Sequence, residues 1–229
     1  MELACDLLGA VRPFPPEWSQ KRRQIRHLLD AVALELRIDV SHSETGLETE
    51  LAGLYRRLRT LGDALGNCTR LPALRPGLVF HHREADGEHY VYVEDAAHHR
   101  LAGYTVFNRL IEVDRRTDRH VRSPHSKYAP SYQGRGIASA VYGWALGRGF
   151  CLVSGARQSE GAHALWRALA RHYPLRWVSL RAKRMHDLGT EVAPELAAEL
   201  DTRMLLLGRG WHLTQLHEQG LLRCETCTT

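Results

Sequence analysis

The sequence predicts a mixed α/β (α+β) fold in which a central, mostly antiparallel sheet is flanked by helices. Three observations lead to this prediction. Short segments of alternating apolar residues, joined by tight turns, occupy residues 78–128. A glycine-spaced run at 132–138 then leads into an apolar helical face, and further apolar runs alternate with helical patterns up to residue 222. Consecutive strands followed by helix–strand–helix units are typical of a mixed sheet.

Residues 1–70 are predicted to form a helical N-terminal portion. After the helix-breaking prolines at 13–16, a helix is expected from about Glu17 to Leu36, and a second one carries an apolar stripe. The stripe consists of Leu47, Leu51, Leu54, Leu58, Leu61 and Leu65. A strand candidate, Leu7–Val11, precedes both helices. The portion is either part of an acceptor-binding half or a separate helical extension, and the sequence leaves both open.

The strands are predicted in the domain that follows, residues 71–229, which a proline-marked linker introduces. Four strands are expected, at Leu78–Phe80, His89–Val93, Leu101–Phe107 and His120–Tyr128. The turns between them are Asp86–Gly87, residues 96–100 and Asp114–Asp118, and the Asp-Gly pair is a strong hairpin signal. The histidine pairs at 81–82 and 98–99 are expected to be solvated strand ends, because neighbours on a strand point to opposite faces.

The second half of this domain is predicted to alternate helices and strands. The helix after the glycine-spaced run has Ile137, Val141, Trp144 and Ala145 on one face. The remaining strands are Phe150–Val153, Arg176–Leu180 and Met204–Leu207, and the remaining helices are 160–173, Pro194–Leu200 and Trp211–Leu222.

Composition narrows the function classes. The chain has 229 residues, of which 44% are hydrophobic and 25% charged, as in globular proteins. No apolar run approaches the ~18 residues that cross a bilayer, and the N-terminus lacks a signal-peptide pattern, so we expect a cytoplasmic protein without membrane contact. Five cysteines and a lone C-x-x-C at Cys224–Cys227 indicate free thiols and no metal site. The net charge of +5 fits a polyanionic ligand and leaves a nucleic-acid partner open.

The run Tyr132–Ala138, with sequence YQGRGIA, carries the main functional signal. Gly134 and Gly136 lie where a strand is predicted to end and a helix to begin, and a residue without a Cβ lets a ligand approach the backbone. The first helical turn offers unpaired N–H groups and the positive end of the helix dipole. We therefore interpret the run as a seat for a diphosphate. The alternative is a tight connection without a ligand, because short glycine motifs also occur by chance.

Gln133, Gly136 and Ala138 fill the motif Q/R-x-x-G-x-G/A, and through it the run resembles the acyl-CoA-binding loop of the GNAT superfamily of N-acetyltransferases. The resemblance covers roughly residues 77–208 and implies a GNAT-like sheet, acetyl-CoA as co-substrate and no metal. It implies direct transfer of an acetyl group to an amine of a small molecule, peptide or protein, and a nucleic-acid acceptor stays open. Family members carry Asn, Ala and Tyr where this chain has Ser159, Ala162 and Trp166.

The resemblance also assigns binding residues. The pantetheine arm would run along a strand bulge at 127–130, where Tyr128 and Ala129 lie. The loop Gln133, Gly134, Arg135, Gly136, Ile137 and Ala138 would hold the diphosphate, with Arg135 adding a charged contact or staying solvated. Trp166 is either core or a wall against pantetheine.

For catalysis, the resemblance implies a base on the strand before the loop, and His125 and His120 are the candidates there, with Glu112 and Asp114 further back. Ser154 and Ser159 are candidates near the thioester, although Ser159 is also a plain helix N-cap. The absent tyrosine keeps a second hypothesis open, in which the chain is an inactive CoA-binding or interaction module.

Overall fold

The structure, a computed structural model, describes residues 44–224. The compact unit to which they belong begins at Glu44. The expected helix Glu17–Leu36, the strand candidate Leu7–Val11 and Cys227 lie outside the described residues, and the domain boundary predicted at residue 70 stays a prediction.

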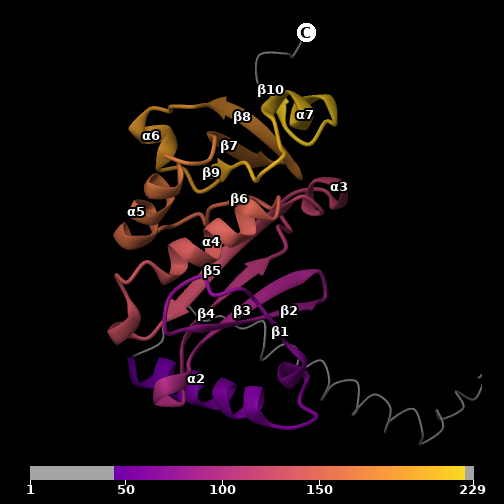
Figure 1. The fold of residues 1–229 in the computed structure, drawn as a ribbon. Helices are drawn as coiled ribbons and strands as arrows, with labels where there is room; N and C mark the ends of the chain where they lie inside the picture. The colour runs from indigo at the N-terminus through magenta and orange to yellow at the C-terminus, as the bar shows by residue number, and fades with distance from the viewer. Residues whose placement is uncertain (1–43, 225–229) are drawn as a thin grey trace, which may run out of the picture. The chain divides into compact units, whose positions relative to one another are not determined.

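A single mixed sheet organises this unit (Figure 1). Its strands are β1 (Thr69–Arg70), β2 (Val79–Ala85), β3 (Glu88–Asp95), β4 (Arg100–Asn108), β5 (Val121–Tyr128), β6 (Cys151–Val153), β7 (Leu175–Arg181), β8 (Arg184–Gly189), β9 (Thr202–Leu206) and β10 (Arg223–Cys224). Their order across the sheet is β1-β2-β3-β4-β5-β6-β9-β7-β8-β10. Only the pairs β5–β6 and β8–β10 are parallel among these strands. The predicted fold class, a mostly antiparallel mixed sheet flanked by helices, is confirmed.

Helices cover both faces of the sheet. They are α2 (Glu44–Arg59), α3 (Arg115–Asp118), α4 (Ile137–Gly147), α5 (Glu160–Leu169), α6 (Pro194–Ala197) and α7 (Leu213–Glu218), with single 3₁₀ turns η1 (Ala64–Asn67), η2 (Ala96–His98) and η3 (Pro130–Tyr132). Lys127 of β5 contacts Glu50 of α2, whereas its neighbour Ser126 contacts Tyr142 of α4. Because neighbouring residues of a strand point to opposite faces, α2 and α4 cover opposite faces of β5.

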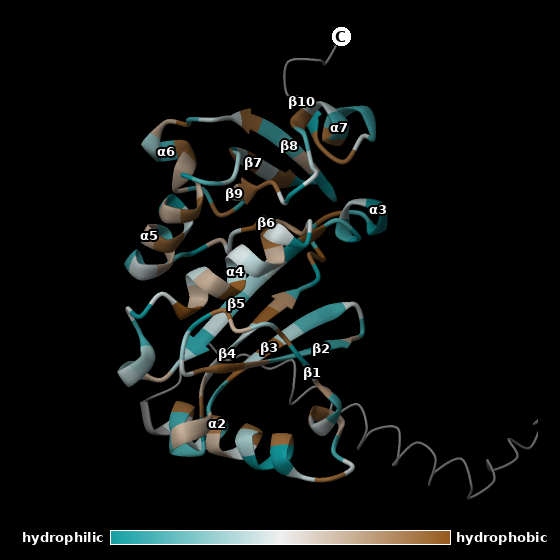
Figure 2. Cartoon of the chain, viewed as in Figure 1, coloured by the Kyte–Doolittle hydropathy of each residue, from teal (hydrophilic) through white to brown (hydrophobic). Residues whose placement is uncertain are grey.

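Two apolar clusters form the core. The first joins the middle strands to α4 and α5 through Phe107, Val141, Leu152 and Trp166, and the second joins β6, β7 and β9 to α7. Figure 2 shows hydrophobic residues, in brown, along the central strands and hydrophilic residues, in teal, on parts of α2, β2 and β8. The amphipathic patterns of the sequence therefore identify the buried faces.

Several predicted elements differ from the structure in extent. The predicted apolar stripe included Leu61, but α2 ends at Arg59 and Leu61 is fully exposed. Asp114–Asp118 is a short helix rather than a turn, since the Asp114 carboxylate accepts from the N–H groups of residues 116 and 117. The pair at 98–99 lies in a turn and not on a strand, and His81 is not solvated but pairs with the buried Glu94 at 2.7 Å.

Candidate active site

The site begins where two parallel strands part. β5 pairs with β6 at two positions only, Val121↔Cys151 and Arg122↔Leu152. The rest of β5, from Ser123 to Tyr128, continues to pair with β4 in unbroken register. One edge of this stretch therefore has no strand beside it among the described residues.

The peptide groups on this open edge can be identified from the register. Cys151 N–H donates to His120 O, so His120 points its carbonyl toward β6. Because alternate residues of a strand point their peptide groups to the same edge, Arg122, Pro124, Ser126 and Tyr128 do likewise. Pro124 has no N–H to offer β6. The open edge thus presents the N–H groups of Ser126 and Tyr128 and the carbonyls of residues 124 and 126.

The loop after β5 is tied back to the strand. The Gln133 side-chain Nε2 donates to the Tyr128 carbonyl at 2.9 Å, and Ala129 N–H donates to Ala102 O at 3.0 Å. The predicted bulge at 127–130 is wrong: β5 stays regular up to Tyr128, and η3 starts at Pro130. A strand end followed by a tight turn therefore delivers the chain to the glycine loop.

The two glycines of the loop adopt a backbone that other residues rarely adopt. Gly134 has φ +69° and Gly136, the N-cap of α4, has φ +70°. A Cβ on Gly134 would meet no atom within 4 Å, so this position is open. Ile137 is buried at the start of α4, with Ala138 packed against the same core. The expected arrangement of strand, glycine loop and helix N-terminus is present.

Three arginines surround the loop. The guanidinium carbons of Arg100 and Arg135 lie 5.3 and 5.4 Å from the centroid of the Tyr132 ring. Arg75 Nη2 donates to the Arg135 carbonyl at 2.9 Å. Arg135 was expected from the sequence, but Arg75 and Arg100 were not, because they come from segments far away in the chain. Their charges make the loop electropositive.

His125 lies on the stretch of β5 that pairs with β4 but not with β6, on the face that α2 covers. Its Nε2 is buried and has no hydrogen-bond partner among the described residues. Burial lowers the pKa of His125, the nearby Lys127 lowers this pKa further, and Glu50 opposes the shift. Glu50 itself accepts from Tyr104 Oη at 2.5 Å and Lys127 Nζ at 3.1 Å. His125 is therefore a neutral imidazole beside a charged pair.

The other predicted catalytic residues are not gathered around His125. His120 packs edge-on against Trp211 at 5.0 Å, five residues before His125 and therefore roughly 17 Å away along the strand. Ser154 Oγ accepts from Met204 N–H at 3.0 Å, and Ser159 Oγ caps α5 by accepting from Ala162 N–H. Both serines thus have structural hydrogen bonds. Glu112 pairs with Arg203, and Asp114 caps α3.

Trp166 lies in the core, 3% exposed, with its ring edge-on to Tyr142. A hydroxyl network that the sequence did not indicate lies above it: Ser126 Oγ donates to Tyr142 Oη at 3.4 Å, and Thr105 Oγ1 contacts both Ser126 Oγ and Tyr128 Oη. Burial raises the pKa of Tyr142 to about 12, so its hydroxyl stays protonated at neutral pH. The network lies on the α4 side of the stretch of β5 that does not pair with β6.

Gln158 is a second residue that the sequence did not indicate. Its Oε1 is buried without a partner in the described part of the chain, and its Nε2 makes only a long contact of 3.8 Å to Met204 Sδ. Ser154 binds the backbone of the same methionine. A buried carboxamide acceptor without a donor near the end of β6 suits an amide N–H of a ligand.

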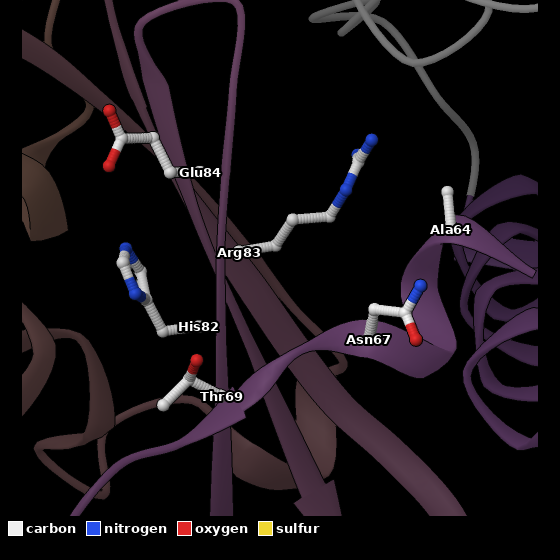
Figure 3. A pocket seen from close by; sticks show the side chains of 6 residues that line it. All are labelled: Ala64, Asn67, Thr69, His82, Arg83 and Glu84. Carbon is white, nitrogen blue, oxygen red and sulfur yellow. The ribbon is translucent and has the colours of Figure 1, made fainter.

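A separate hollow of about 460 Å³ lies at the outer edge of the sheet, and Figure 3 shows its lining side chains. They are Ala64, Asn67, Thr69, His82, Arg83 and Glu84. None of them was predicted as a site residue, and the hollow belongs to β1 and β2 rather than to the β5–β6 opening. Within residues 44–224, no group of three or more His, Cys, Asp or Glu side chains is arranged to hold a metal ion. No described helix has the length and apolarity to span a bilayer.

Comparison with known proteins gives matches to solved structures. No family model and no curated protein sequence matches the chain. A GNAT superfamily phosphinothricin acetyltransferase from Sinorhizobium meliloti, solved with AcCoA, matches with 22% identity and TM-score 0.35, over 54% of this chain and 63% of that one. RimL, a ribosomal alpha-N-protein acetyltransferase in complex with coenzyme A, matches with 15% identity and TM-score 0.31, over 52% and 60%.

A ribosomal-protein-S5-alanine acetyltransferase from Vibrio fischeri matches with 12% identity and TM-score 0.33, over 75% of this chain and 92% of that one. The chain spans less than two thirds of the length of the first two structures. These three matched structures are acetyltransferases.

Proposed function

We propose that this protein is an acyltransferase that moves an acetyl group from acetyl-CoA to an amine in a single ternary complex. The observation that carries the proposal is the parting of β5 and β6 immediately before the glycine loop. An unpaired strand edge suits the amide-bearing pantetheine arm, and a helix N-terminus preceded by two glycines suits its diphosphate. Both lie on one continuous stretch, from Pro124 to Ala138, so a single extended ligand would contact both.

In this proposal the cofactor is held mainly by backbone groups. The N–H groups of Ser126 and Tyr128 face the open edge, the Gln158 carboxamide offers an unpaired acceptor, and the first turn of α4 faces the diphosphate. Gln133 fixes the loop relative to β5 through the Tyr128 carbonyl. Such contacts do not depend on the acyl group or on the acceptor, so they suit a co-substrate common to many reactions.

His125 is the proposed base. The amine nitrogen attacks the thioester carbonyl carbon, a C–N bond forms, and the C–S bond breaks to release CoA as a thiolate. The amine becomes acidic as the C–N bond forms, and a neutral imidazole can then take its proton. The lowered pKa of His125 keeps the imidazole neutral near pH 7. The thiolate needs no dedicated acid, because thiol pKa values are about 8.5.

A CoA-binding module without catalysis is the second candidate, and the burial of His125 Nε2 favours it. One experiment separates the two. Acetyl-CoA binding is measured by calorimetry, and thiol release is followed with a panel of small amines, peptides and aminoacyl-tRNA, with His125→Ala as the control variant. Binding with His125-dependent thiol release supports the transferase. Binding without release for any acceptor supports the module, and absence of binding contradicts both.

A further inference from the structure

Arg75 is placed against the glycine loop by a well-anchored segment. The residues between β1 and β2 pack on the first core cluster through Leu71, Leu74 and Leu78. The Leu78 N–H donates to the Arg75 carbonyl at 3.4 Å, and Gly77 between them has φ +76°. Pro76 followed by a glycine with positive φ is the signature of a type II turn. The backbone of Arg75 is therefore fixed, although its side chain reaches 60 residues along the sequence to Arg135.

The Arg75 guanidinium fills the space directly over the N-cap of α4. Its Nη2 donates to the Arg135 carbonyl at 2.9 Å, and a Cβ built on Gly136 would stand 1.9 Å from the same nitrogen. The positive φ of Gly136 favours glycine at this position, whereas the close approach involves only the flexible end of the Arg75 side chain, which can shift. The guanidinium occupies the position from which an anion would contact the first turn of α4.

A cation is electrostatically misplaced there. The N-terminus of a helix carries partial positive charge, and Arg135 and Arg100 add two more guanidinium groups around Tyr132. Within residues 44–224, Arg75 forms no ion pair and has one hydrogen bond, to a carbonyl. The carboxylate of Asp95 accepts from Tyr132 Oη at 2.6 Å and from His98. The loop therefore concentrates positive charge that an anion would neutralise.

We propose that Arg75 is a ligand of the CoA diphosphate, and that its guanidinium leaves the Arg135 carbonyl to bind a phosphate when the cofactor enters. This inference rests on the proposed function and adds a cofactor-binding residue from outside the glycine loop. A guanidinium binds phosphate through two parallel N–H donors, each to a separate phosphate oxygen. A carbonyl has a single oxygen and no charge, so it is the weaker partner. Arg75 would thus exchange a weak neutral acceptor for a charged one.

The test compares Arg75→Gln with Arg70→Gln, a matched control that removes an exposed arginine from β1, five residues earlier. Dissociation constants are measured by calorimetry for CoA and, separately, for inorganic pyrophosphate, and thermal unfolding checks that each variant is folded. We expect Arg75→Gln to raise the dissociation constants of both ligands about tenfold or more, as for the loss of a charge-assisted hydrogen bond. Arg70→Gln should stay within about twofold of the parent, and high salt should reduce the difference.

Arg75→Lys keeps the charge and loses the two-pronged geometry, so its affinity should fall between those of the parent and Arg75→Gln. Equal or tighter binding by a folded Arg75→Gln overturns the inference while leaving the proposed function intact. If the parent binds pyrophosphate in an Arg75-dependent way but does not bind CoA, the proposed function fails and the diphosphate site stands. If Arg75→Gln does not fold, Arg75→Lys decides, and parent-like affinities for both ligands count against the inference.

Discussion

Replacing Gly103 by alanine should disturb the site through β4, the strand that pairs with β5. Gly103 of β4 pairs with Tyr128, the last residue of β5. A Cβ on Gly103 would stand 2.3 Å from the Lys127 carbonyl oxygen and 2.6 Å from the Tyr128 Cα. Cβ contacts below 3.0 Å do not persist in proteins, and these atoms belong to the backbone, so the end of β5 must move.

The size of the effect follows from that displacement. Relieving the contact with the carbonyl requires a shift of about 0.7 Å, and overpacking of this kind costs about 1–3 kcal/mol of unfolding free energy. For a unit of this size, that loss lowers the Tm by about 2–4 °C per kcal/mol. The same shift moves the Tyr128 carbonyl, which anchors Gln133. We therefore expect Gly103→Ala to lower CoA affinity as well as stability.

The assay is urea unfolding followed by circular dichroism, combined with CoA calorimetry. Gly143→Ala is the control: Gly143 is inside α4, and a Cβ there would meet no atom within 4 Å. Alanine should stabilise this position by about 0.5–1 kcal/mol, because glycine is the poorer helix former. The two variants should thus change stability in opposite directions. Equal stability of Gly103→Ala and the parent would refute the close β4–β5 contact on which the site depends.

Five further predictions test individual residues. His125→Ala should lower kcat/KM by about 10²–10⁴-fold. Lys127→Met removes a charge that lowers the pKa of His125, so the acid limb of the pH–rate profile should move to higher pH. A shift of this limb to lower pH would contradict the assignment of His125 as the base. Gln133→Ala removes the hydrogen bond to the Tyr128 carbonyl, and CoA binding measured by calorimetry should weaken about tenfold. Unchanged binding would show that this hydrogen bond is dispensable. Trp166→Ala should cost about 3–5 kcal/mol in urea unfolding and leave CoA affinity intact; weaker binding without lost stability would place Trp166 against pantetheine. Pro124→Ala restores an N–H group that points toward β6. We expect this amide to exchange its hydrogen slowly and CoA binding to weaken. Fast exchange of the amide would show that something other than Pro124 keeps β5 and β6 apart.

The features predicted correctly from the sequence are those that local chemistry determines. The Asp86–Gly87 turn has positive φ at both residues, as the Asp-Gly pair predicts, and it joins two strands of matching register. β8 was missed for the opposite reason. The turn that leads into it, at Ala182 and Lys183, also has positive φ at both residues but lacks the Asn or Gly that usually marks such a turn. The sequence therefore carries no signal for this hairpin.

Only the parts of the site whose residues are neighbours in the sequence could be predicted from it. Gln133 and Gly136 lie together in the sequence, and the loop they form has the expected positive φ values and helix N-terminus. The contact of Arg75 with that loop depends on a turn 60 residues away and could not be read from local spacing. Likewise, His120 and His125 look equivalent in the sequence. Only the structure separates His120, in the turn before β5, from His125, on the part of β5 that does not pair with β6.

Each edge of β5 stops pairing just before a proline: pairing with β4 ends at Tyr128, ahead of Pro130, and pairing with β6 ends at Arg122, ahead of Pro124. Continuing the β5–β6 ladder by one step would need an N–H from residue 124 to the Val153 carbonyl, and proline has no N–H. The missing donor does not disturb the pairing with β4, because the peptide groups of Pro124 face the β6 side, and β5 keeps its register with β4 up to Tyr128. We therefore expect Pro124 to be the cause of the opening between the strands, and the peptide groups of β5 beyond it face no other strand among the described residues.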